Sequence, residues 1–242
     1  CDPFLLGQRS LAVAASDLAA MGATPLAFTL ALTLPTVNAD WLQAFARGLN
    51  QMAVACNLRL IGGDTTRGPL CLTLTVFGRV PSGCALTRSG AQPGDVLCVG
   101  GELGNAAGAL PLVLGQRSAE SFVAQPLLAH YWSPQPQLAL GQALRGKATC
   151  ALDISDGLLA DCGHLALASQ VRLLIDSDRV PVSLALEEFL GSAGAQQAAL
   201  SGGDDYVLAF TLPERDVPTL QADGWPIHVI GRVVEGQGDG LL

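Results

Sequence analysis

The sequence predicts a two-domain protein of the α/β class, an α+β arrangement in which helices cover β-sheets in layers. Helix-like and strand-like segments alternate before residue 82, and this β-α-β-α order is typical of layered α/β proteins. A stretch rich in proline and glycine follows and is typical of a linker. We therefore expect an N-terminal domain over residues 1–81 and a C-terminal domain over residues 82–242.

The first expected helix spans residues 9–21, because Leu11, Ala15 and Leu18 recur on one face at the helical period. Asp17 projects about 120° away from that apolar face, so we expect it outside the core. The other elements expected in this domain are a strand over 26–34, a helix over 40–56, a short apolar run over 58–61 that leads into a glycine-rich turn, and a strand over 70–80.

The second domain is expected to continue the alternation of strands and helices. Its expected strands cover residues 96–100, 148–153, 172–176, 206–212 and 227–234. Its expected helices cover residues 104–115, 118–130, 136–145, 157–168, 184–190 and 195–200, with a further helix from 214.

Composition excludes several classes of protein. The net charge of −8 and the pI near 4.7 argue against nucleic acid as a partner, because such proteins usually carry a basic stripe. No apolar run reaches the roughly 18 residues that a membrane-spanning helix needs. Seven cysteines occur without a C-x-x-C pair or a zinc-like spacing, and no secretory leader is visible. We expect a cytoplasmic protein with no membrane partner.

Acidic residues gather in three glycine-rich segments beside predicted strands: 62–66 (GGDTT), 153–157 (DISDG) and 201–206 (SGGDDY). Mg²⁺ takes oxygen ligands from carboxylates and phosphates alike, so such segments suit a site for metal-bound phosphate. Each segment alone also fits a plain turn, and Ser155 or Asp156 fits an ordinary helix N-cap. The coincidence of three segments in one acidic chain favours the metal and phosphate interpretation.

Other catalytic motifs receive little support. Residues 141–148 (GQALRGKA) match the P-loop spacing, but Ala148 replaces the required serine or threonine, and the segment runs from a helix into a strand. The three histidines are isolated, and His164 is interpreted as a surface pair with Asp161. Arg88 lies near the domain junction, where its guanidinium would suit a phosphate; a solvated arginine is the alternative.

Taken together, these motifs resemble those of the thiamine-monophosphate kinases, in the superfamily that also contains aminoimidazole ribonucleotide synthetase and selenophosphate synthetase. The resemblance covers nearly the whole chain, and its first motif is the most specific. The matching segments are 11–23 (LAVAASDLAAMGA) with 30–35 (LALTLP), 60–67 (LIGGDTTR), 86–95 (LTRSGAQPGD), 153–158 (DISDGL) and 201–206 (SGGDDY).

The resemblance implies a fold like that of aminoimidazole ribonucleotide synthetase, with a dimer-forming sheet in the N-terminal α/β domain and a layered α/β C-terminal domain. It implies Mg²⁺-dependent, direct in-line transfer of the γ-phosphoryl group of ATP to thiamine monophosphate by a homodimer. Phosphoryl transfer of this kind needs charge neutralisation and alignment more than a protein nucleophile.

The resemblance also assigns roles to individual residues. Asp17, Asp64, Asp153 and Asp156 would be magnesium ligands; Gly63, Asp64, Arg88 and Ser155 would contact the nucleotide; Asp204 would contact the substrate; and Asp64, Asp156 and Arg88 would act in catalysis.

Two alternatives and two departures accompany this hypothesis. The alternatives are another ATP-dependent synthetase or phosphotransferase of the superfamily, and a non-catalytic dimeric fragment that binds ATP and Mg²⁺. The family often has glutamate where this chain has Asp204. Its N-terminal Gly-Asp-Asp and Ser-Thr-Asp stretches have no counterpart before Cys1, and its C-terminal aromatic residue has none before Leu242. We therefore expect a partial copy of the family sequence.

Overall fold

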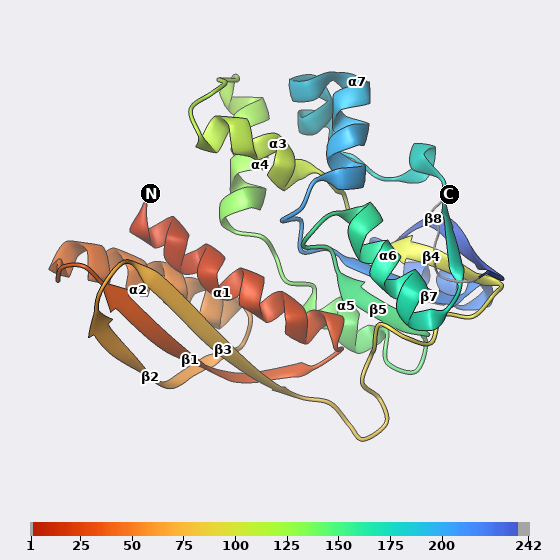
Figure 1. Ribbon diagram of the computed structural model, residues 1–242, viewed down its shortest axis with the longest axis horizontal. Coiled ribbons are helices and arrows are strands. Elements are labelled where there is room, and N and C mark those ends of the chain that lie inside the picture. Colours follow the sequence, from red (N-terminus) through yellow and green to blue (C-terminus); the bar gives the residue numbers. More distant parts are fainter. Residues whose placement is uncertain (1, 237–242) are drawn as a thin grey trace.

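The protein folds into two sheets with helices packed against them, as the computed structural model shows (Figure 1). It describes residues 2–236, so the two chain ends, Cys1 and Leu242, lie outside the described residues. Within the described range no helix is both long and apolar enough to cross a membrane.

The first sheet has three strands in the order β2-β1-β3, with β1 parallel to β2 and antiparallel to β3. Two helices cover one of its faces, and the opposite face is open (Figure 1). The elements are α1 (Pro3–Ala20), β1 (Thr24–Leu34), α2 (Ala39–Ala55), β2 (Arg59–Arg67) and β3 (Cys71–Arg79).

Helix α1 begins six residues before its expected start. The side chain of Asp2 caps it by accepting a hydrogen bond from the Phe4 N–H at 2.7 Å, and Pro3 occupies the first turn, where its missing N–H is harmless. Leu11 and Leu18 then pack with Phe28 in the core between helices and sheet. The earlier start lengthens the N-terminal half of α1.

The expected turn over residues 62–66 is instead part of β2, so the prediction of an acidic turn after a strand is wrong for this segment. Gly63 pairs with Leu30 and Asp64 pairs with Ala31 of β1. Gly63 has φ of 151°, and a Cβ at this position would overlap the carbonyl oxygen of Leu30. The glycine therefore permits the two strands to approach, and the β-branched Thr65 and Thr66 favour continuing the strand.

The second sheet has five strands in the order β5-β7-β4-β8-β6, and every neighbouring pair is antiparallel. Helix α7 contains the break that was expected between two helices, because Gly191 has a non-helical backbone with φ of 73°. The strands are β4 (Asp95–Val99), β5 (Cys150–Asp153), β6 (Arg172–Ile175), β7 (Leu208–Pro213) and β8 (His228–Val234). The helices are α3 (Asn105–Val113), α4 (Ser121–Trp132), α5 (Leu138–Ala143), α6 (Leu158–Ser169), α7 (Leu184–Ser201) and α8 (Val217–Ala222).

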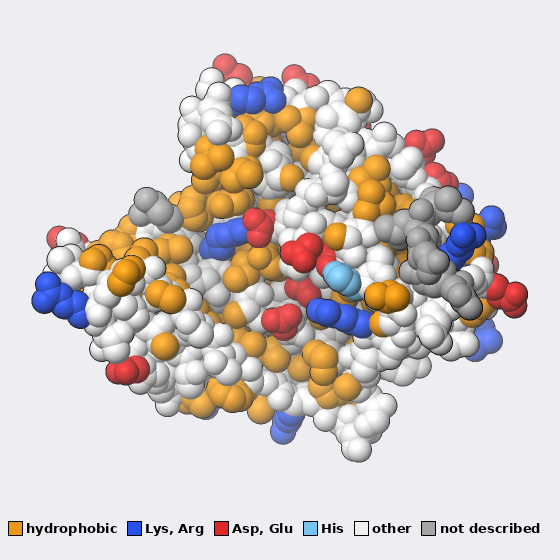
Figure 2. Space-filling model, viewed as in Figure 1, with side chains coloured by type: hydrophobic (Ala, Val, Ile, Leu, Met, Phe, Trp, Pro, Cys, Tyr) orange, Lys and Arg blue, Asp and Glu red, His pale blue; other side chains and the backbone are white. Residues whose placement is uncertain are grey.

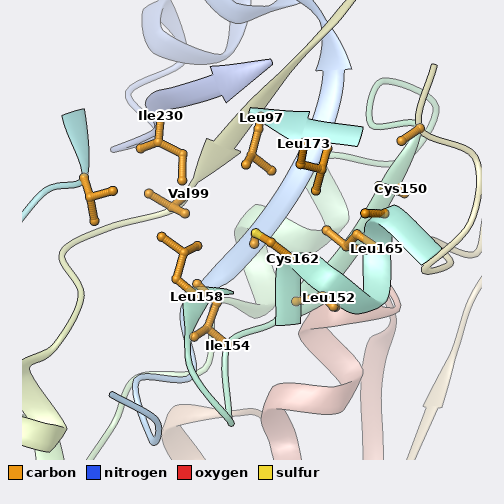
Figure 3. Close-up of a cluster of buried hydrophobic side chains, with 14 of the residues drawn as sticks. Leu97, Val99, Cys150, Leu152, Ile154, Leu158, Cys162, Leu165, Leu173 and Ile230 are labelled. Carbon is orange, nitrogen blue, oxygen red and sulfur yellow. The ribbon is translucent and has the colours of Figure 1, made fainter. Parts of the chain in front are cut away.

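Both faces of the second sheet are buried at its central strands β4 and β7. Alternate residues of β4 point to opposite faces: Leu97 and Val99 join the core beneath α6 (Figure 3), whereas Val96 and Cys98 join the core on the other side. Ala19 of α1 belongs to that second core. The last turn of α1 is thus packed into the neighbouring domain.

Further contacts fix α1 against the second domain. A Cβ on Gly141 of α5 would overlap the Ala19 carbonyl, so the two helices approach closely. The Arg145 side chain donates to the Gly22 carbonyl at 2.5 Å and to Oγ1 of Thr24 at 2.9 Å. Helix α1 is therefore held in a defined position beside β5, with Asp17 near residues of the second domain.

Candidate active site

A pocket of about 210 Å³ lies between the end of α1 and the second domain. Asp17 from α1, Arg88 from the segment between the domains and Asp153 from the end of β5 all line it. Figure 2 shows acidic side chains gathered near the middle of one face, beside basic ones, where the layer containing α1 meets the rest of the molecule. The structure thus brings together three of the site residues named in the sequence analysis.

The electrostatics of this pocket favour a bound cation. Partial burial raises the pKa of Asp17, the negative charge of Asp153 raises it further, and the Arg88 guanidinium opposes the increase. Two carboxylates therefore share a confined space with one arginine. Because Mg²⁺ is commonly held by one or two carboxylates together with substrate phosphates, this donor set fits the implied metal.

The backbone around Arg88 is fixed from three sides. The Leu86 N–H donates to the Met21 carbonyl just after α1, at 3.2 Å, and the Ala151 N–H of β5 donates to the Thr87 carbonyl at 2.9 Å. The Ser169 hydroxyl at the end of α6 donates to the Arg88 carbonyl at 3.4 Å. Arg88 is therefore anchored between the end of α1, β5 and the end of α6.

The loop between β5 and α6 is organised by Asp161. Its Oδ2 accepts hydrogen bonds from the N–H groups of Ser155 at 2.9 Å and of Asp156 at 3.0 Å. Helix α6 begins after Gly157 and has no side-chain N-cap, so the interpretation of Ser155 or Asp156 as a cap is wrong. The side chain of Asp156 is exposed.

Asp161 itself is buried, so its interpretation as a surface partner of His164 is also wrong. Burial raises the pKa of Asp161, the hydrogen bonds from the Asp156 and Ser155 amides lower it, and the charges of Asp156 and Asp153 raise it again. The loop therefore keeps several carboxylates close together against their mutual repulsion.

The loop before β7 packs on the same region. The Asp204 N–H donates to the Ser155 carbonyl at 2.9 Å, and the Tyr206 N–H donates to the Ile154 carbonyl at 2.8 Å. Asp204 and Tyr206 have positive φ values of 70° and 54°, a conformation that costs non-glycine residues about 1–3 kcal/mol each. The surrounding hydrogen bonds hold this strained loop against the β5–α6 loop.

Two side chains meet Oδ1 of Asp204. The Tyr206 hydroxyl donates to it at 2.9 Å, and Nη2 of Arg9 lies 2.8 Å away. Burial, followed by the charge of Asp204, raises the pKa of Tyr206, which keeps the phenol protonated. The predicted substrate contact is thus part of a network that includes Arg9 of α1.

Residues 1–80 match the N-terminal domain of the AIR synthase related protein family, and residues 92–242 match its C-terminal domain. The thiamine-monophosphate kinase of Escherichia coli strain K12 is 47% identical over 237 residues, which cover 96% of this chain and 73% of that relative. The chain belongs to the thiamine-monophosphate kinase family.

Solved thiamine-monophosphate kinase structures confirm the predicted fold class. That of Stenotrophomonas maltophilia K279a superposes with a TM-score of 0.93 at 44% identity, covering 99% of this chain and 80% of that one. A structure of AaThiL complexed with AMPPCP and TMP has a TM-score of 0.91 at 27% identity, covering 100% of this chain and 77% of that one.

Asp64 and Gly63, which the thiamine-monophosphate kinase motifs assign to metal and nucleotide, lie apart from the pocket lining. Asp64 is exposed on β2, and its Oδ1 accepts a hydrogen bond from the Thr65 N–H at 2.8 Å. Within residues 2–236, no three acidic, histidine or cysteine side chains lie close enough to hold a metal ion by themselves. Any metal here would need further ligands, which phosphate oxygens could supply.

Sequence reasoning missed Arg9, Asp161 and Tyr206. Arg9 has no motif around it; it lies about two helical turns before Asp17 on α1, but only the tertiary structure shows that its side chain reaches Asp204. Asp205, next to the predicted Asp204, has a structural role, since its Oδ2 accepts from the Gly104 N–H at 2.7 Å before α3.

Proposed function

We propose that this chain transfers the γ-phosphoryl group of ATP to the phosphate of thiamine monophosphate, giving thiamine diphosphate and ADP. The observation that carries the proposal is the convergence of Asp17, Arg88 and Asp153 on one pocket between two domains of a thiamine-monophosphate kinase family member. In-line phosphoryl transfer needs this combination of metal-binding carboxylates and a cation.

The site residues would have the following roles. Asp17, Asp153 and Asp156 would hold Mg²⁺, with Asp64 as a further candidate ligand. Arg88 would bind a phosphate oxygen, while Ser155 and Gly63 would contact the nucleotide. Asp204 would contact the acceptor. Bound Mg²⁺ would supply positive charge that neutralises the transferred phosphoryl group.

We also propose that the chain works as a homodimer formed through its first sheet. The face of this sheet away from α1 and α2 exposes Phe77 of β3, and Leu26, Ile61 and Leu70 are exposed around the same three strands. Large apolar side chains left exposed at an uncovered sheet are a feature of interaction surfaces. The dimer would cover this sheet face.

Phosphorus NMR tests the proposed reaction. The protein is incubated with ATP, Mg²⁺ and thiamine monophosphate, and we expect the signals of thiamine diphosphate and ADP to grow together. EDTA should abolish both. ADP formed only with a different phosphate acceptor would favour another phosphotransferase of the superfamily. Binding of ATP and Mg²⁺ without any turnover would favour the non-catalytic fragment.

A further inference from the structure

Arg9 connects the first domain to the acceptor side of the candidate site. It extends from α1, its Nη1 donates to the Tyr131 carbonyl at the end of α4, and its Nη2 pairs with Asp204 at 2.8 Å. The guanidinium carbon also lies 4.1 Å from the centre of the Tyr131 ring, which is a favourable cation–π distance. A single side chain therefore joins three segments that are far apart in the sequence.

The environment of Arg9 differs from that of a solvated surface arginine. Only 15% of its side chain is exposed, whereas 43% of the Asp204 side chain is exposed. The planar guanidinium is held by stacking and by hydrogen bonds in two directions, so little further ordering is needed to keep its position. Arg9 is the fixed partner of the pair, and Asp204 is the partner that a ligand can reach.

The hydrogen bonds of Asp204 are distributed unequally between its two oxygens. Arg9 and Tyr206 both contact Oδ1. In the described part of the chain, Oδ2 accepts no hydrogen bond. An ionised carboxylate has about four acceptor sites over two oxygens, so Oδ2 keeps its capacity to accept from a donor or to pair with a cation.

We propose that Arg9 is a positioning residue for the phosphate acceptor: together with Tyr206 it fixes Oδ1 of Asp204, so that Oδ2 receives the cationic, amino-bearing thiamine part of the substrate. This inference rests on the proposed function. Arg9 acts through Asp204 and does not itself take part in phosphoryl transfer. Its removal should weaken acceptor binding and spare ATP binding.

A double-mutant cycle on Arg9→Met and Asp204→Asn tests the proposal. We expect Arg9→Met to raise the KM and the Kd for thiamine monophosphate about tenfold, with the KM for ATP within about twofold of wild type. The double variant should bind the acceptor no worse than the more weakly binding single variant, because Arg9 acts only through the Asp204 carboxylate and has nothing left to position once that carboxylate is gone. Arg9→Lys, which keeps the charge, and Tyr206→Phe, which keeps Arg9, should give smaller losses.

Arg145→Met is the matched control, because Arg145 also joins the two domains but contacts Gly22 and Thr24 rather than Asp204. It should lower the melting temperature without changing the ratio of the two KM values. Equal increases in both KM values for Arg9→Met, or additive losses in the double variant, would overturn the proposal.

Failure of the proposed function has a different signature. Wild-type protein that binds thiamine monophosphate but yields no thiamine diphosphate would reject the kinase activity, and the Kd values would still decide the role of Arg9. Wild-type protein that does not bind thiamine monophosphate would reject the role of Arg9 as well.

Discussion

Asp17 illustrates how individual residues of the pocket are placed for binding at the expense of stability. Burial and the neighbouring Asp153 raise its pKa, so the folded protein holds a proton on Asp17 more tightly than the unfolded chain does. As pH rises from the ordinary value of 3.8 through the raised pKa, the unfolded chain releases its proton first, and the free energy of unfolding falls. At neutral pH the ionised group is therefore expected to destabilise the metal-free fold modestly, because solvent screens the charge of this exposed residue.

Asp17→Asn should consequently raise the melting temperature at pH 7 in EDTA. It should also make the free energy of unfolding fall less between pH 4 and 7 than it does in wild type. The same change should suppress Mg²⁺-dependent turnover, because one metal-binding carboxylate is lost. Calorimetry over this pH range and the product assay provide the two readouts. Asp178→Asn, at an exposed carboxylate beside the edge strand β6, is the control and should change neither. A lower melting temperature for Asp17→Asn in EDTA would contradict the account.

The exposed Asp156 should matter for turnover and little for folding. Asp161 binds the Asp156 N–H, a contact that does not involve the Asp156 side chain. We expect Asp156→Asn to reduce kcat by at least about 100-fold, in the range seen when one group that stabilises transition-state charge is lost, and to leave the melting temperature close to wild type. Normal turnover in this variant would reject its assignment as a metal ligand.

Asp161→Ala should affect both properties. It removes the acceptor that two partly buried loop amides share, and leaving a buried amide unsatisfied costs up to about 1–3 kcal/mol. We expect a loss of that size in the free energy of unfolding, measured by urea titration, together with a lower kcat because the loop carrying Asp153 and Asp156 loosens. Unchanged unfolding in urea would show that other contacts hold the loop.

Among the elements, β2 shows why a glycine pair was misinterpreted. Paired glycines before an acid are typical of turns, and the short apolar run before them suggested that the strand had ended. The pairing with β1 decides otherwise, because Gly63 is where the backbone of β2 comes closest to Leu30. The close packing of β2 against β1 therefore requires glycine at position 63, and no local sequence pattern reveals this requirement.

The two glycines make a matched pair of variants. Gly63→Ala should lower the free energy of unfolding by at least about 2 kcal/mol, because its Cβ would overlap the backbone of Leu30. Gly62→Ala should stay within about 1 kcal/mol of wild type or be slightly more stable, since a Cβ there meets nothing within 4 Å. Chemical denaturation of both proteins measures the difference. Equal effects would show that β2 is not held in this register.

At the scale of the whole molecule, α1 unites the two domains and the first sheet leaves one face uncovered. Helix α1 packs into both cores and carries Arg9 and Asp17 to the second domain. The uncovered face exposes Phe77. The same domain would therefore provide one wall of the site and the proposed dimer interface.

Phe77→Lys should weaken that dimer, because it places a charge on the open face of the sheet. We expect wild type to sediment as a dimer and Phe77→Lys to sediment largely as a monomer at micromolar concentration. Val54→Lys, at an exposed apolar residue on α2, is the control and should remain dimeric. Identical sedimentation of wild type and Phe77→Lys would place the interface elsewhere or exclude it.

The sequence by itself determined the alternation of helices and strands, the family motifs and the acidic residues of the candidate site, because these depend on local periodicity and on short segments of characteristic composition. Only the tertiary structure decided that Gly62–Thr66 continues a strand, that Asp161 is buried beneath a loop and that Arg9 meets Asp204. Each of these depends on pairing or packing between segments distant along the chain, and no local pattern encodes such contacts.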